Sequence, residues 1–177
     1  TISLFGGGRG PSVSNVIDYV TTTTLGNAAD FGNLTTSATA NGLANNTRAI
    51  FTGLNTVPAA PGVIDFVTIS TTGNASDFGD LTDARYATGM AASSTRGLMA
   101  GGRTGGGSVR NIIDYITIAT TGNATDFGDL TVARYSSTGL SNTTRAVFSG
   151  GETPYQNVID FVTIASTGDA SDFGDLL

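Results

Sequence analysis

Acidic side chains recur at fixed spacing in one kind of turn, and they are the residues whose types could most readily do chemistry. Each set has an amide or acid, then two aspartates at intervals of three residues: Asn74, Asp77 and Asp80; Asn123, Asp126 and Asp129; Asp169, Asp172 and Asp175. Oxygen ligands at such short spacing could hold calcium. The turns lack the D-x-D-x-D-G order of known calcium loops, and aspartates in glycine-rich turns commonly bond their own backbone. We interpret them as structural and predict no metal site, with calcium binding as the alternative.

Composition excludes most other catalytic and cofactor chemistry. The 177 residues include no Cys, His or Trp, and the eight basic residues are all Arg, so Lys is absent as well. Without Cys and His there is no thiolate or imidazole ligand for zinc or copper, and no Ser-His-Asp or Cys-His nucleophile. Without Lys there is no Schiff-base chemistry. We predict that the protein is not an enzyme and binds no cofactor.

Charge and hydropathy exclude two further classes of partner. The net charge of -6 opposes the electrostatic attraction to phosphates on which nonspecific nucleic-acid binding depends, and no basic patch offsets it. No run of eighteen apolar residues could span a bilayer. The sequence therefore predicts neither a nucleic-acid partner nor membrane insertion.

Four copies of one repeat make up the chain, and these repeats must position any site. An N-V-I-D-Y-like anchor places an aspartate at Asp18, Asp65, Asp114 and Asp160, in steps of 47, 49 and 46 residues. A D-F-G anchor follows thirteen residues later with Phe31, Phe78, Phe127 and Phe173. A T-R anchor contributes Arg48, Arg96 and Arg145. We interpret all of these as structural repeat residues.

Each repeat contains four short segments with the composition of β-strands. In the last copy they are ARYSSTGLS, RAVFSGG, NVIDFVTIA and ASDFGDLL, separated by turns rich in Gly, Asn and Thr. The third segment is apolar on both faces, as expected of a strand in a sheet that is covered on both sides. Four strands in a period of 46–49 residues are typical of a propeller blade. We predict an all-β fold, a β-propeller of four repeats with about fifteen strands.

The predicted propeller is a single domain spanning residues 1–177. Its blades comprise about residues 1–36, 37–83, 84–132 and 133–177, and the first blade lacks its first strand. Two arrangements are consistent with a first blade that lacks one strand. One is a ring of four blades, one of them three-stranded, and the other is a window of a longer tandem array. An open blade edge would invite pairing with another chain, so self-association is also expected.

The order of these motifs resembles the kelch repeat over essentially the whole chain. The shared elements are GG, then N-x-I-D-[YF], then an aromatic, then L-T-x-A-R. Two departures are Phe where kelch repeats usually have Trp, and a longer loop before that aromatic. The sequence GNATDFGDLT is also similar to kelch-like repeats in uncharacterised proteins of marine bacteriophages. That resemblance implies a virion or tail-fibre component.

The periodic aspartates lie within apolar strands, where an unpaired carboxylate would be costly. Their recurrence in every repeat indicates a scaffold role, because a single active site would break the symmetry. Two sets of arginines recur with the same period and could be the partners: Arg48, Arg96 and Arg145, or Arg85 and Arg134. Either set has the forked guanidinium that suits a carboxylate.

One connection in each repeat, between the second and third strands, changes in length and composition. These variable loops contain all four prolines and every arginine outside the periodic sets. The candidate partner-binding residues are Arg9, Pro11, Asn55, Pro58, Arg103, Arg110, Glu152 and Tyr155. In a propeller such loops emerge on one face, so they form the predicted binding surface. Unselected drift of the loops is the alternative explanation.

Two functions follow from these observations. The first is a noncatalytic structural and binding module of a bacteriophage virion or tail fibre, which contacts a host surface or another protein subunit. The alternative is a secreted bacterial lectin-like or adhesin domain that binds a surface glycan. Both place the protein on a virion or outside the cell.

Overall fold

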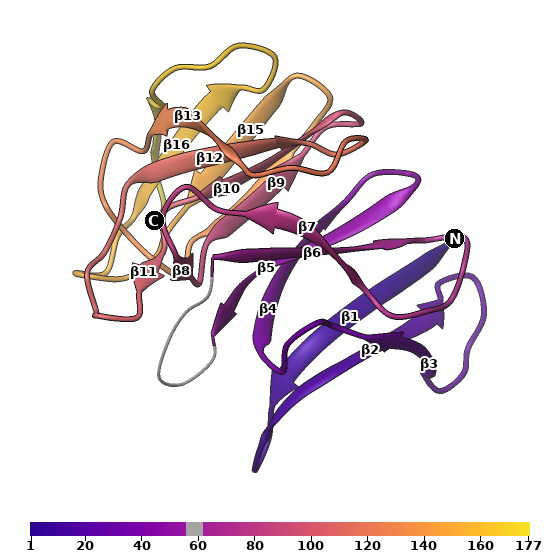
Figure 1. The fold of residues 1–177 in the computed structure, drawn as a ribbon. Helices are drawn as coiled ribbons and strands as arrows, with labels where there is room; N and C mark the ends of the chain where they lie inside the picture. Colours follow the sequence, from indigo (N-terminus) through magenta and orange to yellow (C-terminus); the bar gives the residue numbers. More distant parts are fainter. Residues whose placement is uncertain (56–61) are drawn as a thin grey trace.

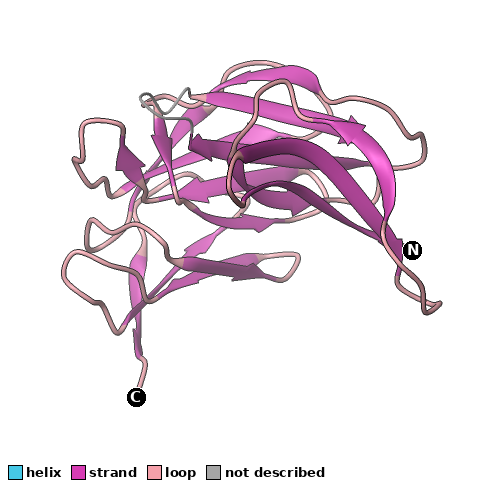
Figure 2. Ribbon diagram, turned by 90° about the horizontal axis from the view of Figure 1, so that it is seen from below, coloured by secondary structure: helices cyan, strands magenta, loops and turns pink. Residues whose placement is uncertain are grey.

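The computed structural model describes residues 1–55 and 62–177. These residues form strands β1 to β17 and no helix (Figures 1 and 2), which confirms the predicted all-β class. The described residues accordingly contain no helix that could cross a membrane. Pro58, one of the predicted loop residues, lies outside the described residues.

The first two repeats share one seven-stranded sheet. Its strand order is β3-β2-β1-β4-β5-β6-β7, and the halves meet through a single pair of residues, Gly7 of β1 and Thr39 of β4. Residues 1–36 contain β1 (Ile2–Arg9), β2 (Val13–Thr21) and β3 (Ala29–Asn33). Residues 37–83 contain β4 (Thr39–Ala44), β5 (Arg48–Asn55), β6 (Val63–Thr68) and β7 (Ser76–Asp80).

The last two repeats each form a separate antiparallel sheet of four strands. Residues 84–132 contain β9 (Gly89–Ala92), β10 (Arg96–Ala100), β12 (Ile112–Thr117) and β13 (Thr125–Asp129), and a short two-stranded sheet of β8 (Arg85–Tyr86) and β11 (Arg103–Thr104). Residues 133–177 contain β14 (Thr138–Ser141), β15 (Arg145–Ser149), β16 (Val158–Thr163) and β17 (Ser171–Asp175). We call the four segments repeats 1 to 4.

A β-bulge recurs at the periodic aspartate of every repeat. The register between the third and fourth strands shifts directly before the aspartate, for example between Ile113 and Asp114 on β12. The same shift occurs in the other three repeats. A bulge increases the local twist and redirects the side chain that follows it. Each of these strand pairs also carries an edge-to-face contact between an aromatic ring and the D-F-G phenylalanine, with centroids 5.8–6.0 Å apart.

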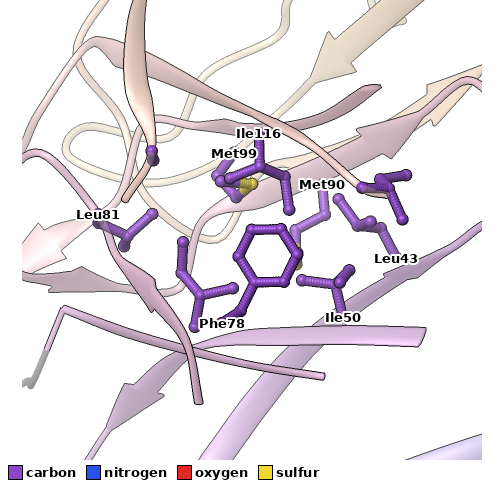
Figure 3. Close-up of a cluster of buried hydrophobic side chains, with 10 residues drawn as sticks. Leu43, Ile50, Phe78, Leu81, Met90, Met99 and Ile116 are labelled. Atoms are coloured by element: carbon purple, nitrogen blue, oxygen red, sulfur yellow. The ribbon is translucent and has the colours of Figure 1, made fainter. Parts of the chain in front are cut away.

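The buried core is divided into three clusters, each of which joins one repeat to the next. The cluster in Figure 3 combines Leu43, Ile50, Phe78 and Leu81 of repeat 2 with Met90, Met99 and Ile116 of repeat 3. Equivalent clusters join repeats 1 and 2 and repeats 3 and 4. Each internal sheet therefore packs one apolar face on the preceding repeat and the other on the following repeat.

Backbone hydrogen bonds repeat at the same three junctions. The turn before the fourth strand, which we call the connecting turn, donates to the fourth strand of the preceding repeat. The bonds of 2.7 Å run from Gly73 N to Phe31 O, from Gly122 N to Phe78 O, and from Gly168 N to Phe127 O. A Cβ on Gly79 would lie 2.4 Å from the carbonyl oxygen of Gly122. The glycine of D-F-G is therefore required for this close approach.

Candidate functional site

The periodic aspartates of repeats 3 and 4 are buried in ion pairs. Asp114 lies 2.9 Å from Arg85 and Asp160 lies 2.9 Å from Arg134, and all four side chains have no exposed surface. Of the two sets of arginines that the sequence offered, the structure pairs the aspartates with this one. Arg85 also donates to backbone carbonyls, including that of Gly101 at 2.7 Å. These contacts satisfy the guanidinium of Arg85 and both carboxylates where water cannot reach them, whereas Nε of Arg134 is buried with no hydrogen-bond partner among the described residues.

A threonine from the end of the preceding repeat completes each of these buried sites. Thr82 Oγ1 donates to Asp114 at 2.6 Å, and Thr131 Oγ1 donates to Asp160 at 2.6 Å. The threonine follows the fourth strand of one repeat, whereas the aspartate belongs to the third strand of the next. The carboxylate therefore ties two repeats together, in agreement with a structural role.

Asp65 of repeat 2 is equally buried but has a different set of partners. Ala38 occupies the position of Arg85 and Arg134 in the repeat, so no guanidinium is available there. Thr35 donates to the carboxylate from its backbone N at 2.8 Å and from its Oγ1 at 2.7 Å. Burial raises the pKa of Asp65, and the hydrogen bonds from Thr35 only partly oppose that rise.

The arginines of the T-R anchor have another role. Their guanidinium carbons lie over aromatic rings of the same repeat: Arg48 over Phe66 at 4.6 Å, Arg96 over Tyr115 at 4.6 Å and Arg145 over Phe161 at 4.5 Å. Nη1 of Arg48 and of Arg96 also donates at 2.8 Å to a carbonyl of the following repeat, that of Ile118 and Ile164 respectively. The cation–π contacts lie within a repeat, whereas the hydrogen bonds of Arg48 and Arg96 join their repeat to the next one.

The acidic turns use their oxygens on backbone groups. Asp77, Asp126 and Asp172 accept from the amide of the D-F-G glycine two residues later, at 3.0–3.2 Å. Asn123 accepts from the amide of Asp80 across a junction, at 3.1 Å. In the described part of the chain no three Asp or Glu side chains are grouped as a metal site would require.

Asp169 replaces the asparagine of the earlier repeats at the junction between repeats 3 and 4. Its Oδ1 accepts from the amide of Asp129 at 3.0 Å. Burial, together with the nearby negative charges of Asp169 and Asp126, raises the pKa of Asp129. This junction therefore collects negative charge that the other two junctions do not have.

The variable loops of repeats 3 and 4 meet through a tyrosine. The guanidinium carbon of Arg103 lies 5.4 Å from the ring centroid of Tyr135, and the Tyr135 hydroxyl donates to Glu152 Oε2 at 2.6 Å. That hydrogen bond to a carboxylate is the main cause of the raised pKa of Tyr135. We call Arg103, Tyr135 and Glu152 the loop cluster. Sequence analysis found two of its members but missed Tyr135, whose only signal was the A-R-Y motif shared with Tyr86.

The other predicted loop residues are dispersed. Arg9 and Pro11 are exposed beside the turn between β1 and β2, and Tyr155 is 91% exposed in the loop between β15 and β16. Arg110 forms an ion pair with Asp83, and each side chain keeps about a third of its surface exposed. Asn55 is the last residue of β5. In Figure 1 the β1–β2 turn lies at the bottom of the view, whereas the β8–β11 sheet lies at the left, at about mid-height.

A separate apolar cleft of about 520 Å³ lies between β1 and the strands β4 and β5. Leu4, Leu43 and Phe51 are among its lining residues, and none of the described lining residues is ionisable. It opens where the two halves of the seven-stranded sheet diverge from their single point of pairing. The cleft can accept apolar groups but presents no acid, base or nucleophile.

The loop cluster is the candidate binding site, because it combines a guanidinium, a phenol and a carboxylate at the surface. Such groups suit the hydroxyls, amides and acidic groups of a glycan or of another protein. Comparison of the chain with models of known families and with curated proteins finds no match.

Proposed function

We propose that the protein is a noncatalytic structural and binding module whose repeats are the blades of a β-propeller. Successive sheets packed face to face, each with one face toward the preceding and one toward the following repeat, support this arrangement. The inner strands β9 and β14 are neighbours, as first strands of adjacent blades would be. Stacked blades of this kind present their connecting loops at the two ends of the propeller axis.

The contrast between constant junctions and variable loops carries the proposal. The hydrogen bonds, apolar contacts and buried carboxylates recur from repeat to repeat, whereas the loops after the second strand differ in length and charge. The constant part accounts for folding. The loops of repeats 3 and 4 are free to specify a ligand, and they already contribute the loop cluster and the exposed ring of Tyr155.

The proposed setting is a bacteriophage virion or tail fibre, with the loops in contact with a host surface or with another subunit. The resemblance of the repeats to phage proteins supports this setting. A bacterial surface glycan is the ligand class that we favour. Exposed tyrosine rings stack on sugars, and a guanidinium beside a carboxylate binds hydroxyl and acidic groups. A secreted lectin-like adhesin would use the same loops in the same way.

Binding of the labelled protein to a printed array of bacterial surface polysaccharides tests the proposal. We expect binding that is lost in the loop variants Tyr155→Ser and Arg103→Ser. Thr121→Ala, an exposed change in a connecting turn, is the matched control and should bind as the parent does. If the control lost binding and the loop variants kept it, the connecting turns would be the binding surface and the loop assignment would be wrong.

A further inference from the structure

One position at the loop end of repeats 2 to 4 changes its chemistry while its backbone setting stays constant. It pairs across the strands with the residue that follows Ala38, Arg85 or Arg134. The cross-strand pairs are Thr39 with Asn55, Tyr86 with Arg103, and Tyr135 with Glu152. The fold therefore holds this position by its backbone and accepts an amide, a guanidinium or a carboxylate there, so the side chain is free to bind a ligand.

The side chain of Arg103 is held in place by its own loop and by the next repeat. Its Nε donates to the carbonyl of Gly107 at 3.2 Å, and its guanidinium carbon lies 5.4 Å from the ring centroid of Tyr135. The loop is closed by backbone hydrogen bonds of 2.9 Å from Thr104 N to Ser108 O and from Gly107 N to Thr104 O. Gly107 has a φ of 90°, and a Cβ there would lie 3.3 Å from Nη2 of Arg103, so the loop wraps closely round the side chain. A guanidinium that is preorganised in this way loses little conformational entropy when it binds a ligand.

The positive charge of Arg103 has no ionic partner among the described residues. Arg110, in the same loop, pairs with Asp83, whereas no ion pair in the described part of the chain includes Arg103. Glu152 accepts on Oε2 from the hydroxyl of Tyr135. With Nε of Arg103 bonded to a backbone carbonyl, Nη1 and Nη2 of this half-buried guanidinium have no acceptor among the described residues. Two such N–H groups side by side match the two oxygens of a carboxylate.

We propose, on the basis of the proposed glycan-binding function, that the loop cluster binds an acidic sugar unit of a surface glycan. The carboxylate of the sugar takes the two Nη groups of Arg103. A hydroxyl of the same or the adjoining unit donates to Glu152, whose Oε1 has no donor among the described residues. Both contacts border the ring of Tyr135, so a ligand of one or two sugar units reaches both. A singly charged carboxylate suits the site better than a phosphate monoester, since Glu152 repels the additional negative charge.

Local contact, and not the charge of the whole protein, must supply the attraction to this acidic group. The chain has a net charge of -6, so its overall field repels an anionic glycan. Loss of one positive charge at Arg103 should therefore weaken binding, whereas the loss of one positive charge elsewhere should hardly change it. Arg145 offers the matched control, because it is exposed, lies over Phe161 and is outside the variable loops.

Bacterial surface polysaccharides printed in two forms test the proposal. One form is native, and in the other the carboxylates have been reduced to primary alcohols. Titration with the labelled 177-residue chain gives an apparent Kd for each form. We expect the native form of at least one polysaccharide that contains uronic acid to bind. Its reduced form should bind about tenfold more weakly or worse, because the hydrogen bonds to a charged group are lost.

Variants at Arg103 locate the contact on the protein. Arg103→Lys keeps the charge but loses the planar fork, so it should bind the native form about tenfold more weakly, and Arg103→Gln should weaken binding further. Arg145→Gln should bind as the parent does. Glu152→Gln keeps an acceptor oxygen and loses the charge, so it should still prefer the native form to the reduced form. Circular dichroism establishes that each variant is folded.

The outcomes separate the acidic ligand from glycan binding in general. If the parent binds no polysaccharide in either form, the glycan-binding function fails and the acidic ligand fails with it. If the parent binds the native and reduced forms equally, or Arg103→Lys binds as tightly as the parent, glycan binding stands and the acidic ligand is wrong. Loss of binding in Glu152→Gln, with full binding in Arg103→Gln, would also overturn the proposal, because it indicates a neutral or basic sugar.

Discussion

Repeats 2 and 3 bury the same aspartate at the same bulge of the same strand, yet only one of the two carboxylates has a cation beside it. Asp114 is held by Arg85 and Thr82, whereas Asp65 has only Thr35 among the residues that the structure describes. A single substitution, Ala38 for the arginine, makes the difference. The comparison shows that two carboxylates at the same repeat position can be equally buried, while the local partner determines the charge state that burial favours.

The largest expected effect comes from making repeat 3 resemble repeat 2. Arg85→Met keeps an apolar side chain of similar length but leaves Asp114 buried without its cation, which should cost about 3–5 kcal/mol of unfolding free energy at pH 7. Asp114→Ala should be comparably harmful, since it leaves the guanidinium unpaired. Urea denaturation measures both losses, and Arg145→Met, at an exposed equivalent of the other arginine set, is the control.

The pH dependence of the stability lost in Arg85→Met shows whether the lost ion pair is the cause. Asp65, which is buried without a guanidinium, has a raised pKa, so we expect a buried carboxyl that loses its guanidinium to be neutralised more readily as the pH falls. The loss relative to the parent should therefore be greatest at pH 7 and shrink toward pH 4. An equal loss at both pH values would indicate that Arg85 stabilises the fold by packing alone.

A smaller effect on stability should distinguish Thr35 from Thr82. Thr35→Val removes the only side-chain donor to Asp65 among the described residues and should cost about 2 kcal/mol, in the range for hydrogen bonds to charged groups. Thr82→Val leaves Asp114 with Arg85 and should cost about 1 kcal/mol. Thermal unfolding of the two variants in parallel makes the comparison. A larger loss for Thr82→Val would contradict it.

Asp65→Asn, which replaces the carboxylate by a neutral amide, should change the unfolding free energy very little at pH 7. Asp65 has a pKa raised above its unfolded value, so its favourable contribution is present at low pH and is lost as the pH rises through the folded pKa. Asp65→Asn removes this loss. The variant should unfold within about 1 kcal/mol of the parent at pH 7, and its stability relative to the parent should increase from pH 4 upward. Asp114→Asn, which weakens an ion pair, should show a clear loss at pH 7.

The smallest effect is expected at the exposed ion pair. Arg110 and Asp83 have the same charges as Arg85 and Asp114, but about a third of each side chain is exposed and water screens the interaction. Replacing Arg103 and Arg110 together by Ser should therefore change the unfolding free energy by about 0–1 kcal/mol. A loss as large as that of Arg85→Met would show that burial is not what separates the two pairs.

Much of the fold could be predicted because the repeat signals it four times. The segments around Asp18, Asp65, Asp114 and Asp160 are β-branched and apolar, and each forms the third strand of its sheet. The expected number of strands was about fifteen. In repeat 3 the expected first strand, ARYATGMAA, is divided into β8 and β9, and the two-residue strand β11 lies beyond the four expected. A two-residue strand such as β11 is too short for an alternating pattern to predict.

The site was less accessible to sequence reasoning. The pattern marked Arg103 and Glu152 as variable, but it could not show that Tyr135 lies between them, because the three residues come from different strands and loops. The periodicity likewise left two candidate sets of arginines for the aspartates. Residues with the same period are equally spaced in the chain, so spacing alone cannot say which pair of side chains converges.

The sequence by itself determined the strand content, the length of the repeat and the absence of thiol, imidazole and lysine chemistry, because these depend on local propensity and composition. Only the tertiary structure decided which charges are paired and which faces are covered. Asp18 and Asp114 occupy the same repeat position, and Phe173 and Phe127 have the same neighbours in sequence, yet they differ in burial. Burial depends on the adjoining repeat, which no stretch of sequence within a single repeat can specify.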